Sequence, residues 1–296
     1  MEIGLVGRHD GVRGSRVVAA AGGDWAVAGD WELTASVGGE RLAVSSRERL
    51  AGALRFAPGR LWVGGHALDL GMRGWVLLPP LLPAVTARGS SDAEVRDTAW
   101  LEPDGLAVAA ARAQPPRRKG GGAWTPWERL VLLDAETREL RALLAEGPQV
   151  RRLAAEAGTL VAAGDGVRAW RDAGAEPDWL VERGTPPITA LALRADGLIA
   201  AAAPAERDVI LCSPEGDFRR ELPGTARTGA LALHPSQAIV AVGGAAGVEL
   251  RSFEGDVLAS AASDTPVVDL AFGDGGARLL MLAADGLVEL ELRDSG

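Results

Sequence analysis

The chain has 296 residues, a formal net charge of -9 and an isoelectric point near 5.0. Nucleic acids and anionic membranes bind through cationic surface, so this charge argues against broad contact with either. A hydrophobic fraction of 47% supplies a core, and residues 1–296 are expected to form one domain. Because no run of 18 apolar residues occurs, we expect no membrane-spanning helix.

The cellular setting is read from the cysteine content and the N-terminal residues. The single cysteine, Cys212, cannot form an internal disulfide and is expected to be a small buried hydrophobe. The start of the chain has Glu2 where a secretory signal carries positive charge, and its first apolar run, residues 17–21, is too short for such a signal. We therefore expect a cytoplasmic protein. The excess of arginine over lysine and the absence of tyrosine and asparagine point to a bacterial source.

After a first expected strand at residues 2–7, a short phrase recurs along the chain. It reads Leu-Ala-Leu-Arg-Ala-Asp-Gly at residues 191–197 and Leu-Ala-Phe-Gly-Asp-Gly at residues 270–275. The seven copies begin at Val18, Leu54, Ala99, Leu153, Leu191, Leu231 and Leu270. A period of about 40 residues, built from short strands and tight turns, is typical of blades repeated around an axis. The repeats predict an all-β fold of seven blades.

The second repeat ends unusually. Residues 75–78 are expected to form its outer strand, and Pro79 and Pro80 end that strand because proline cannot donate to the ladder. The connection to the third repeat then contains Leu81 and Leu82. Apolar side chains in such a connection either tuck under the blade or form an exposed contact patch, and we weigh both.

The third repeat contains an insertion at residues 114–127. No acidic residue occurs between positions 105 and 127, whereas Arg112, Arg117, Arg118 and Lys119 are basic. Two tryptophans, Trp124 and Trp127, follow a run of glycines. The segment is either a disordered loop with incidental charge or a loop that contacts a partner or a phosphate. Arginine and tryptophan dominate the energetics of interfaces, which favours a contact role as the hypothesis to test.

The two irregular segments are expected on one face of the ring. In a four-stranded blade, the loop between the second and third strands and the connection leaving the fourth strand emerge on the same side. We therefore predict a partner-binding patch formed by Arg117, Arg118, Lys119, Trp124, Trp127, Leu81 and Leu82. Its partner should be a protein with an acidic and apolar surface.

The fifth repeat shows the expected grammar of a blade most clearly. Strands are predicted at residues 188–193, 198–202, 209–212 and 217–222, separated by turns that contain glycine or proline. The second strand is rich in alanine, as are those of several other repeats. Small side chains let neighbouring sheets approach closely, and a blade needs those neighbours to bury both of its faces.

The last repeat has only three expected strands, which end at residues 272, 282 and 292. The strand at residues 2–7 belongs to no repeat. We therefore predict that residues 3–6 pair with residues 287–292 and complete the last blade. This pairing would close the ring and remove two exposed sheet edges.

These phrases resemble a known family. The segment Asp165-Gly-Val-Arg-Ala-Trp170 is similar to the end of a WD40 repeat, where Asp-Gly precedes Val-x-x-Trp. The Leu-Ala-Phe-like phrases resemble the inner strand and turn of such repeats. The resemblance implies a WD40-like seven-bladed β-propeller. The Gly-His pair and the Trp-Asp dipeptide of that family are mostly absent here.

The residues that carry chemistry are dispersed. The three histidines, His9, His66 and His234, lie in different repeats without ligand-like spacing, and no Gly-x-Ser-x-Gly elbow occurs. The Asp-Gly pairs fall at hairpin turns, where backbone geometry favours them over a metal-binding role. We expect no catalytic residues, cofactor or metal.

The hypothesis is therefore a non-enzymatic protein-interaction scaffold, a subunit of a bacterial multi-protein assembly. The alternative is a propeller enzyme or small-molecule sensor that uses the central channel. Charged residues converging on the channel with a bound metal would favour the alternative.

Overall fold

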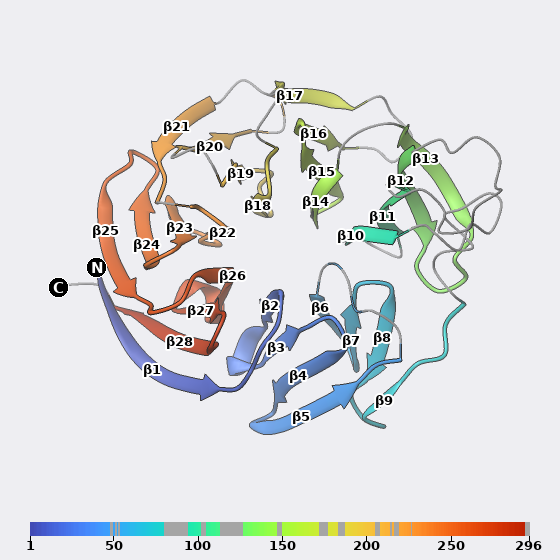
Figure 1. The fold of residues 1–296 in the computed structure, drawn as a ribbon, viewed down its shortest axis with the longest axis horizontal. Coiled ribbons are helices and arrows are strands. Elements are labelled where there is room, and N and C mark those ends of the chain that lie inside the picture. Colours follow the sequence, from blue (N-terminus) through green and yellow to red (C-terminus); the bar gives the residue numbers. More distant parts are fainter. Residues whose placement is uncertain are drawn as a thin grey trace, which may run out of the picture.

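The computed structural model describes residues 1–47, 50, 52, 54–79, 94–101, 105–112, 127–146, 150–171, 177–182, 187–204, 208–213, 215, 219–225 and 227–293. This part of the chain forms 28 strands in seven antiparallel sheets of four strands, arranged in a ring (Figure 1). Its helical residues are confined to two 3-10 turns, η1 (Ala21–Gly23) and η2 (Asp274–Gly276). None of its helices is long and apolar enough to cross a membrane.

The first four blades follow the order of the repeats. Blade 1 contains β2 (Arg16–Ala19), β3 (Trp25–Ala28), β4 (Glu32–Val37) and β5 (Glu40–Ser45). Blade 2 contains β6 (Leu54–Ala57), β7 (Arg60–Val63), β8 (His66–Asp69) and β9 (Gly74–Trp75). Blade 3 contains β10 (Glu94–Leu101), β11 (Gly105–Arg112), β12 (Trp127–Asp134) and β13 (Leu140–Glu146). Blade 4 contains β14 (Val150–Glu156), β15 (Thr159–Gly164), β16 (Gly166–Trp170) and β17 (Asp178–Glu182).

The remaining blades complete the ring. Blade 5 contains β18 (Ala190–Leu193), β19 (Ile199–Ala202), β20 (Asp208–Cys212) and β21 (Arg219–Pro223), close to the predicted strands. Blade 6 contains β22 (Ala230–Leu233), β23 (Ile239–Gly244), β24 (Gly247–Ser252) and β25 (Val257–Ala262). Blade 7 contains β26 (Val267–Gly273), β27 (Arg278–Ala283), β28 (Gly286–Arg293) and β1 (Glu2–Asp10).

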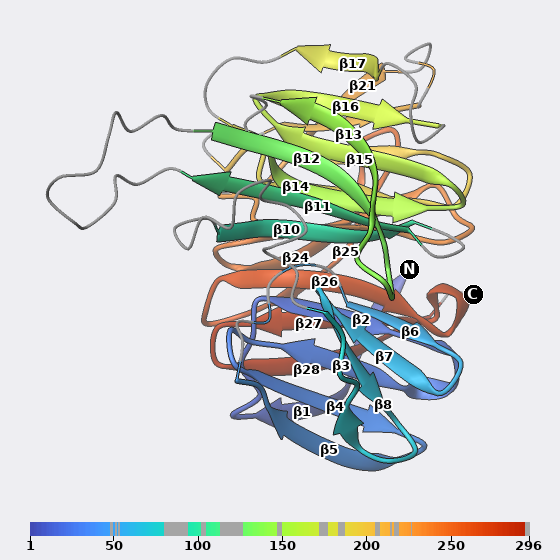
Figure 2. The same cartoon turned by 90° about the vertical axis from the view of Figure 1, so that its right-hand side faces the viewer.

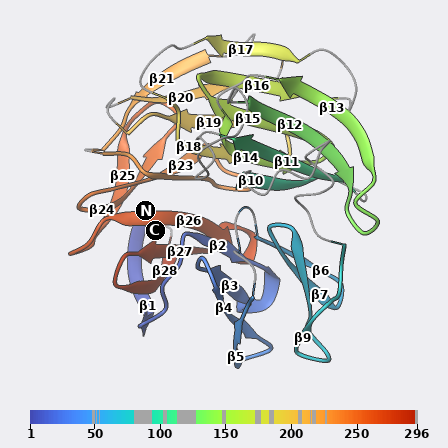
Figure 3. The same cartoon turned by 45° about the vertical axis from the view of Figure 1, so that its right-hand side comes forward.

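The ring closes as the sequence predicted. Strand β1 pairs antiparallel with β28, from Glu2 opposite Arg293 to Asp10 opposite Gly286, with a bulge between Leu5 and Gly7. The two strands lie side by side at the rim (Figures 1 and 3). The last blade therefore takes its outer strand from the start of the chain, which gives β28 a partner on both edges.

The hydrophobic core is divided among the seven seams between neighbouring blades. Between blades 4 and 5, for example, Val161 and Ala163 of β15 pack with Ile199 and Ile210 of the next blade. The second strands are rich in alanine, and Ala200 and Ala201 of β19 are completely buried. Each blade buries its faces against its neighbours, so the ring is stable as a whole rather than blade by blade.

Each blade has its turns on two opposite faces of the ring. We call one of them the crossover face. The chain passes there from one blade to the next, and each second strand turns there into the third. In blade 3, Glu94 at the start of β10 is paired with Ala111 near the end of β11, and Arg112 is paired with Trp127 at the start of β12. Figure 2 shows these three strand ends on one side of the molecule.

The outer strand of blade 2 is shorter than predicted. Strand β9 covers Gly74–Trp75, whereas the sequence predicted a strand over residues 75–78. Its partner β8 has four residues, and the register places Trp75 opposite Leu68 and Gly74 opposite Asp69. The Val76 amide still donates to the carbonyl of Ala67, over 2.8 Å, but the ladder then ends. Residues 76–79 are left outside the sheet.

Candidate interaction site

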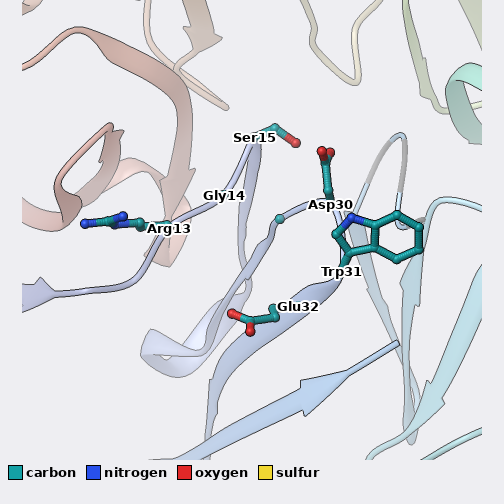
Figure 4. Close-up of a pocket in the computed structure, with 7 residues that line it drawn as sticks. Arg13, Gly14, Ser15, Asp30, Trp31 and Glu32 are labelled. Carbon is teal, nitrogen blue, oxygen red and sulfur yellow. The ribbon is translucent and has the colours of Figure 1, made fainter. Parts of the chain in front are cut away.

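An open hollow lies on the crossover face of blade 1. Its volume is about 450 Å³, and its lining comes from the connection between β1 and β2 and from the turn between β3 and β4 (Figure 4). The lining residues are Arg13, Gly14, Ser15, Gly29, Asp30, Trp31 and Glu32. The hollow therefore combines an indole with charges of both signs.

The backbone around this hollow is held by hydrogen bonds. The amide of Ser15 donates to the carbonyl of Ala28 over 2.8 Å. Gly14 lies against the end of β3 so closely that a Cβ at this position would be 2.5 Å from the same carbonyl oxygen. No other residue fits this approach without displacing the strand. The first wall of the hollow is thus fixed to blade 1.

The opposite wall is tied to the connection between blades 1 and 2. The amide of Leu50 donates to the carbonyl of Asp30 over 2.7 Å, and the amide of Ser46 donates to the carbonyl of Trp31 over 2.8 Å. Leu50 is itself buried in the seam between the two blades. The turn that presents Trp31 is therefore anchored at both of its central residues.

A second hollow adjoins the first, between blades 1 and 2. Its volume is about 370 Å³, and its lining residues are Ser45, Ser46, Arg47, Gly65, His66, Trp75, Val76, Leu77, Leu78 and Pro79. Trp75 fixes this wall, because its indole Nε1 donates to the carbonyl of Ser45 over 3.0 Å. Ser46 belongs to this hollow and also bonds Trp31, so the two hollows share a boundary.

Two large apolar side chains are exposed beside these hollows. Trp31 is 53% exposed and Leu77 is 98% exposed. The other exposed large apolar side chains of the described residues lie on the outer strands β1, β13 and β25 or, for Met72, on the turn between β8 and β9. Among described residues, the crossover face thus displays its large apolar side chains over blades 1 and 2. We call the two hollows together with Trp31 and Leu77 the blade 1–2 surface.

Nearly all of the sequence-predicted site lies outside the described residues. This applies to Arg117, Arg118, Lys119, Trp124, Leu81 and Leu82. Trp127 is placed through its backbone only, as the first residue of β12, paired with Arg112. The described ends nevertheless fix where these segments begin. Strand β11 ends at Arg112 and β12 begins at Trp127 on the crossover face, and Leu81 follows two residues after Pro79 of the second hollow.

Sequence reasoning missed Trp31, Glu32 and Leu77. A signal for the first two was present, because Trp31 stands in the tight turn Gly29-Asp-Trp-Glu32, where a large aromatic side chain has no core to fill. Leu77 was assigned to a strand. Its exposure follows from the early end of β9, which stops although β8 continues to His66, and this end has no local signal in the sequence.

The central channel is the second candidate site, because four charged residues occupy equivalent positions in its wall. Strands β10, β14 and β26 each carry a bulge near their start, and Asp97, Arg152 and Asp269 follow the bulges. Arg16 of β2 holds the same position in blade 1. The amide of Val17 donates to Asp269 of blade 7, just as the amide of Leu153 donates to Asp97 of blade 3. The repeats in blades 1 and 3 therefore begin one residue earlier than the sequence indicated. The residues equivalent to Leu153 and Leu270 are Val17 and Thr98, rather than Val18 and Ala99.

These charges bond to one another and to neighbouring blades. The buried Asp97 carboxylate accepts from the Arg16 guanidinium over 2.6 Å, from the Leu153 amide over 2.8 Å and from the Thr98 amide over 3.1 Å. Arg16 thus reaches past blade 2, which is feasible only on the axis side. Arg152 Nε donates to the carbonyl of Thr189 over 2.7 Å. Two of the three donors to Asp97 come from other blades, Arg16 from blade 1 and the Leu153 amide from blade 4, so this carboxylate holds blades together.

Burial shifts the ionisation of the other channel groups. The pKa of Asp269 is raised by burial, although Arg16 and the amide of Val17 oppose the change. The pKa of Arg152 is lowered by burial and by the nearby positive charge of Arg16. Within the described ranges, no group of three or more His, Cys, Asp or Glu side chains is arranged to hold a metal ion.

The remaining reactive side chains are separated from one another. Cys212 is buried as expected, and burial raises its thiol pKa to about 11. His9 contacts Glu289, with Nε2 and Oε1 2.6 Å apart, whereas His66 lies beside Trp75 in blade 2. His234 is buried in blade 6, and its Nδ1 accepts from the amides of Ser236 and Gln237 over 3.2 and 2.9 Å. The histidines are parts of three different blades.

Comparison with known proteins identifies the fold. No protein-family model matches the chain, and no curated protein matches its sequence. Among solved structures, it is similar to a chain of the "Crystal Structure of Mitotic Checkpoint Complex", with a TM-score of 0.72 and 15% identity over 99% of this chain and 91% of that chain. At such low identity the likeness shows the fold alone. The chain has a seven-bladed β-propeller fold, which is the fold implied by the resemblance to WD40 repeats.

Proposed function

We propose that this protein is a non-enzymatic protein-interaction scaffold that binds a partner protein on its crossover face, over blades 1 and 2. The observation that supports it is the exposure of Trp31 and Leu77 beside two adjoining hollows. Buried tryptophan side chains anchor many interfaces, at about 2 kcal/mol or more each. The hydrogen bonds that fix the turn at Trp31 lower the entropy cost of binding.

The interface extends, in this proposal, to the segment predicted from the sequence. Arg117, Arg118, Lys119, Trp124 and Trp127 would continue the surface over blade 3, with Leu81 and Leu82 between them and the second hollow. A partner with an acidic and apolar surface fits this segment. Positive charge on the segment would speed the encounter, and burial of the tryptophans would supply most of the affinity.

The wider setting is proposed from composition. We propose that the protein is a cytoplasmic subunit of a bacterial multi-protein assembly and that it does not bind nucleic acid. Seven blades present many turns on a rigid ring, which suits the binding of several partners. The neighbour in the mitotic checkpoint complex supports the idea by analogy of fold, since that chain is part of a complex.

The alternative function uses the central channel. It is favoured by the convergence of Arg16, Asp97, Arg152 and Asp269 on the channel wall. The hydrogen bonds of these groups support a structural role instead, because the Asp97 carboxylate joins blade 3 to blade 1 through Arg16 and to blade 4 through the Leu153 amide. We therefore place the channel second.

Affinity capture with quantitative mass spectrometry tests the proposal. The baits are the parent protein, the Trp31→Ala plus Leu77→Ser variant, and a control with Leu143→Ser on the outer strand of blade 3. Leu143 is also half exposed, so the control removes a similar apolar side chain elsewhere. Partners held by the parent and the control but lost by the double variant support the proposed surface. Equal capture by all three baits contradicts it.

A further inference from the structure

We infer that the hollow of blade 1 binds a positively charged side chain, arginine or lysine, supplied by a partner protein. The inference rests on the proposed function, because it takes the blade 1–2 surface as an interface. It adds the chemistry of the group that enters this hollow.

Two carboxylates flank the hollow. Glu32 is the first residue of β4, and the residues that follow it on the core side, Leu33 and Ala35, are buried in the seam with blade 2. Alternation along the strand therefore leaves Glu32 exposed on the other side, and it forms no ion pair with any described residue. Asp30 precedes Trp31 in the same turn, whereas Glu32 follows it. Figure 4 shows the carboxylates of Asp30 and Glu32 on either side of the hollow.

The cation of the lining is turned away from them. In Figure 4 the Arg13 guanidinium lies at the far side of the hollow from Trp31 and points outward. Arg13 is exposed and makes no hydrogen bond or ion pair with a described residue. The carboxylate of Glu32 beside Trp31 is therefore not neutralised by the cation of the lining, in a protein whose net charge is also negative.

Trp31 supplies the second half of the recognition. Its indole is half exposed and its backbone carbonyl is held by the Ser46 amide. A cation that lies over a tryptophan face is attracted by the ring, and a neighbouring carboxylate adds an ion pair. An arginine side chain also stacks its planar guanidinium on such a ring, which an ammonium group cannot do. The long apolar stem of either residue would cover the rest of the indole.

The experiment uses three capped tripeptides, Gly-Arg-Leu, Gly-Lys-Leu and Gly-citrulline-Leu. Citrulline has the shape of arginine without its charge. Binding is followed by NMR at the indole NH signal of Trp31, which is assigned by its loss in Trp31→Phe. We expect the arginine peptide to shift this signal and to bind about fivefold more tightly than the citrulline peptide. The lysine peptide separates a guanidinium site from a general cation site.

Variants define the outcome. Glu32→Gln should remove most of the difference between arginine and citrulline, whereas Glu156→Gln, an exposed carboxylate on blade 4, should leave it unchanged. Equal binding of arginine and citrulline, or no shift of the Trp31 signal at 10 mM peptide, overturns the inference. If partner capture still depends on Trp31 in that case, the proposed interface survives and only its cation chemistry fails.

Discussion

Blade 7 and blade 2 share one plan but end differently. The outer strand β1 of blade 7 is matched to β28 through eight residue pairs, whereas β9 of blade 2 is matched to β8 through two. The long strand commits its residues to the sheet and fixes the seam where the ring closes. The short strand releases residues 76–79, whose apolar side chains line a hollow on the crossover face. Under the proposed function, the long outer strand serves stability and the short outer strand serves recognition.

Deleting residues 1–8 should have the largest effect, because it removes most of β1. The closing seam would lose its ladder and the packing of Ile3 against the core of blades 6 and 7. We expect a loss on the order of 5 kcal/mol in unfolding free energy, measured by urea denaturation, and association through the exposed edge of β28. An unchanged denaturation midpoint with a monomeric product would show that blade 7 does not need β1.

Removing the two channel carboxylates, Asp97 of blade 3 and Asp269 of blade 7, should lower the unfolding free energy by different amounts. Asp97→Ala leaves the Arg16 guanidinium buried without its partner, which costs about 4 kcal/mol. Asp269→Ala removes the acceptor of the Val17 amide, and we expect a smaller loss of about 2 kcal/mol. Thermal or urea unfolding measures both. A larger loss for Asp269→Ala would mean that the main electrostatic tie lies between blades 7 and 1 and not across blade 2.

The seam between blades 6 and 7 should respond to acid through His234. Burial, with help from Arg194, lowers the pKa of this imidazole, and its Nδ1 accepts two amides in the neutral form. A lowered folded-state pKa means that the stabilisation is fully present above the ordinary value near 6.5 and is lost as pH falls through the lower value.

The melting temperature should therefore decrease from pH 7.5 to pH 5, and His234→Gln should flatten the curve. As a control, the two melting curves are repeated in proteins that also carry His9→Gln, which removes the imidazole that contacts Glu289 between β1 and β28. If the His9→Gln protein that keeps His234 shows a pH dependence as flat as that of His234→Gln, the pH dependence does not come from His234.

The smallest change in stability should come from the blade 1–2 surface. Trp31→Ala and Leu77→Ser each remove a side chain that extends into solvent, so the unfolding free energy should change by less than about 0.5 kcal/mol. Urea denaturation beside the parent protein gives the answer. A loss comparable to that of the β1 deletion would assign these side chains to the fold and remove the contrast between the two blades.

The ring itself was predictable because its signals are local. Glycine turns and short apolar strands recur about every 40 residues. Residues 2–7 formed an expected strand outside every repeat, and the last repeat was the one that lacked its fourth strand. The channel network was not predictable, because Arg16 and Asp97 meet across blade 2 and the bulges shift the register by one residue. The sequence-predicted binding patch stays a prediction. Its neighbour, the blade 1–2 surface, depends on where β9 stops.

Hydrogen exchange of the protein with a captured partner is the decisive measurement. We expect slower exchange on binding in residues 13–15, 29–32, 45–47, 65–66 and 75–79, the segments that line the two hollows. The outer strands β13 and β25 should exchange as in the free protein. Protection confined to those outer strands, or to the turns on the face opposite the crossover face, would contradict the claim that blades 1 and 2 hold the partner.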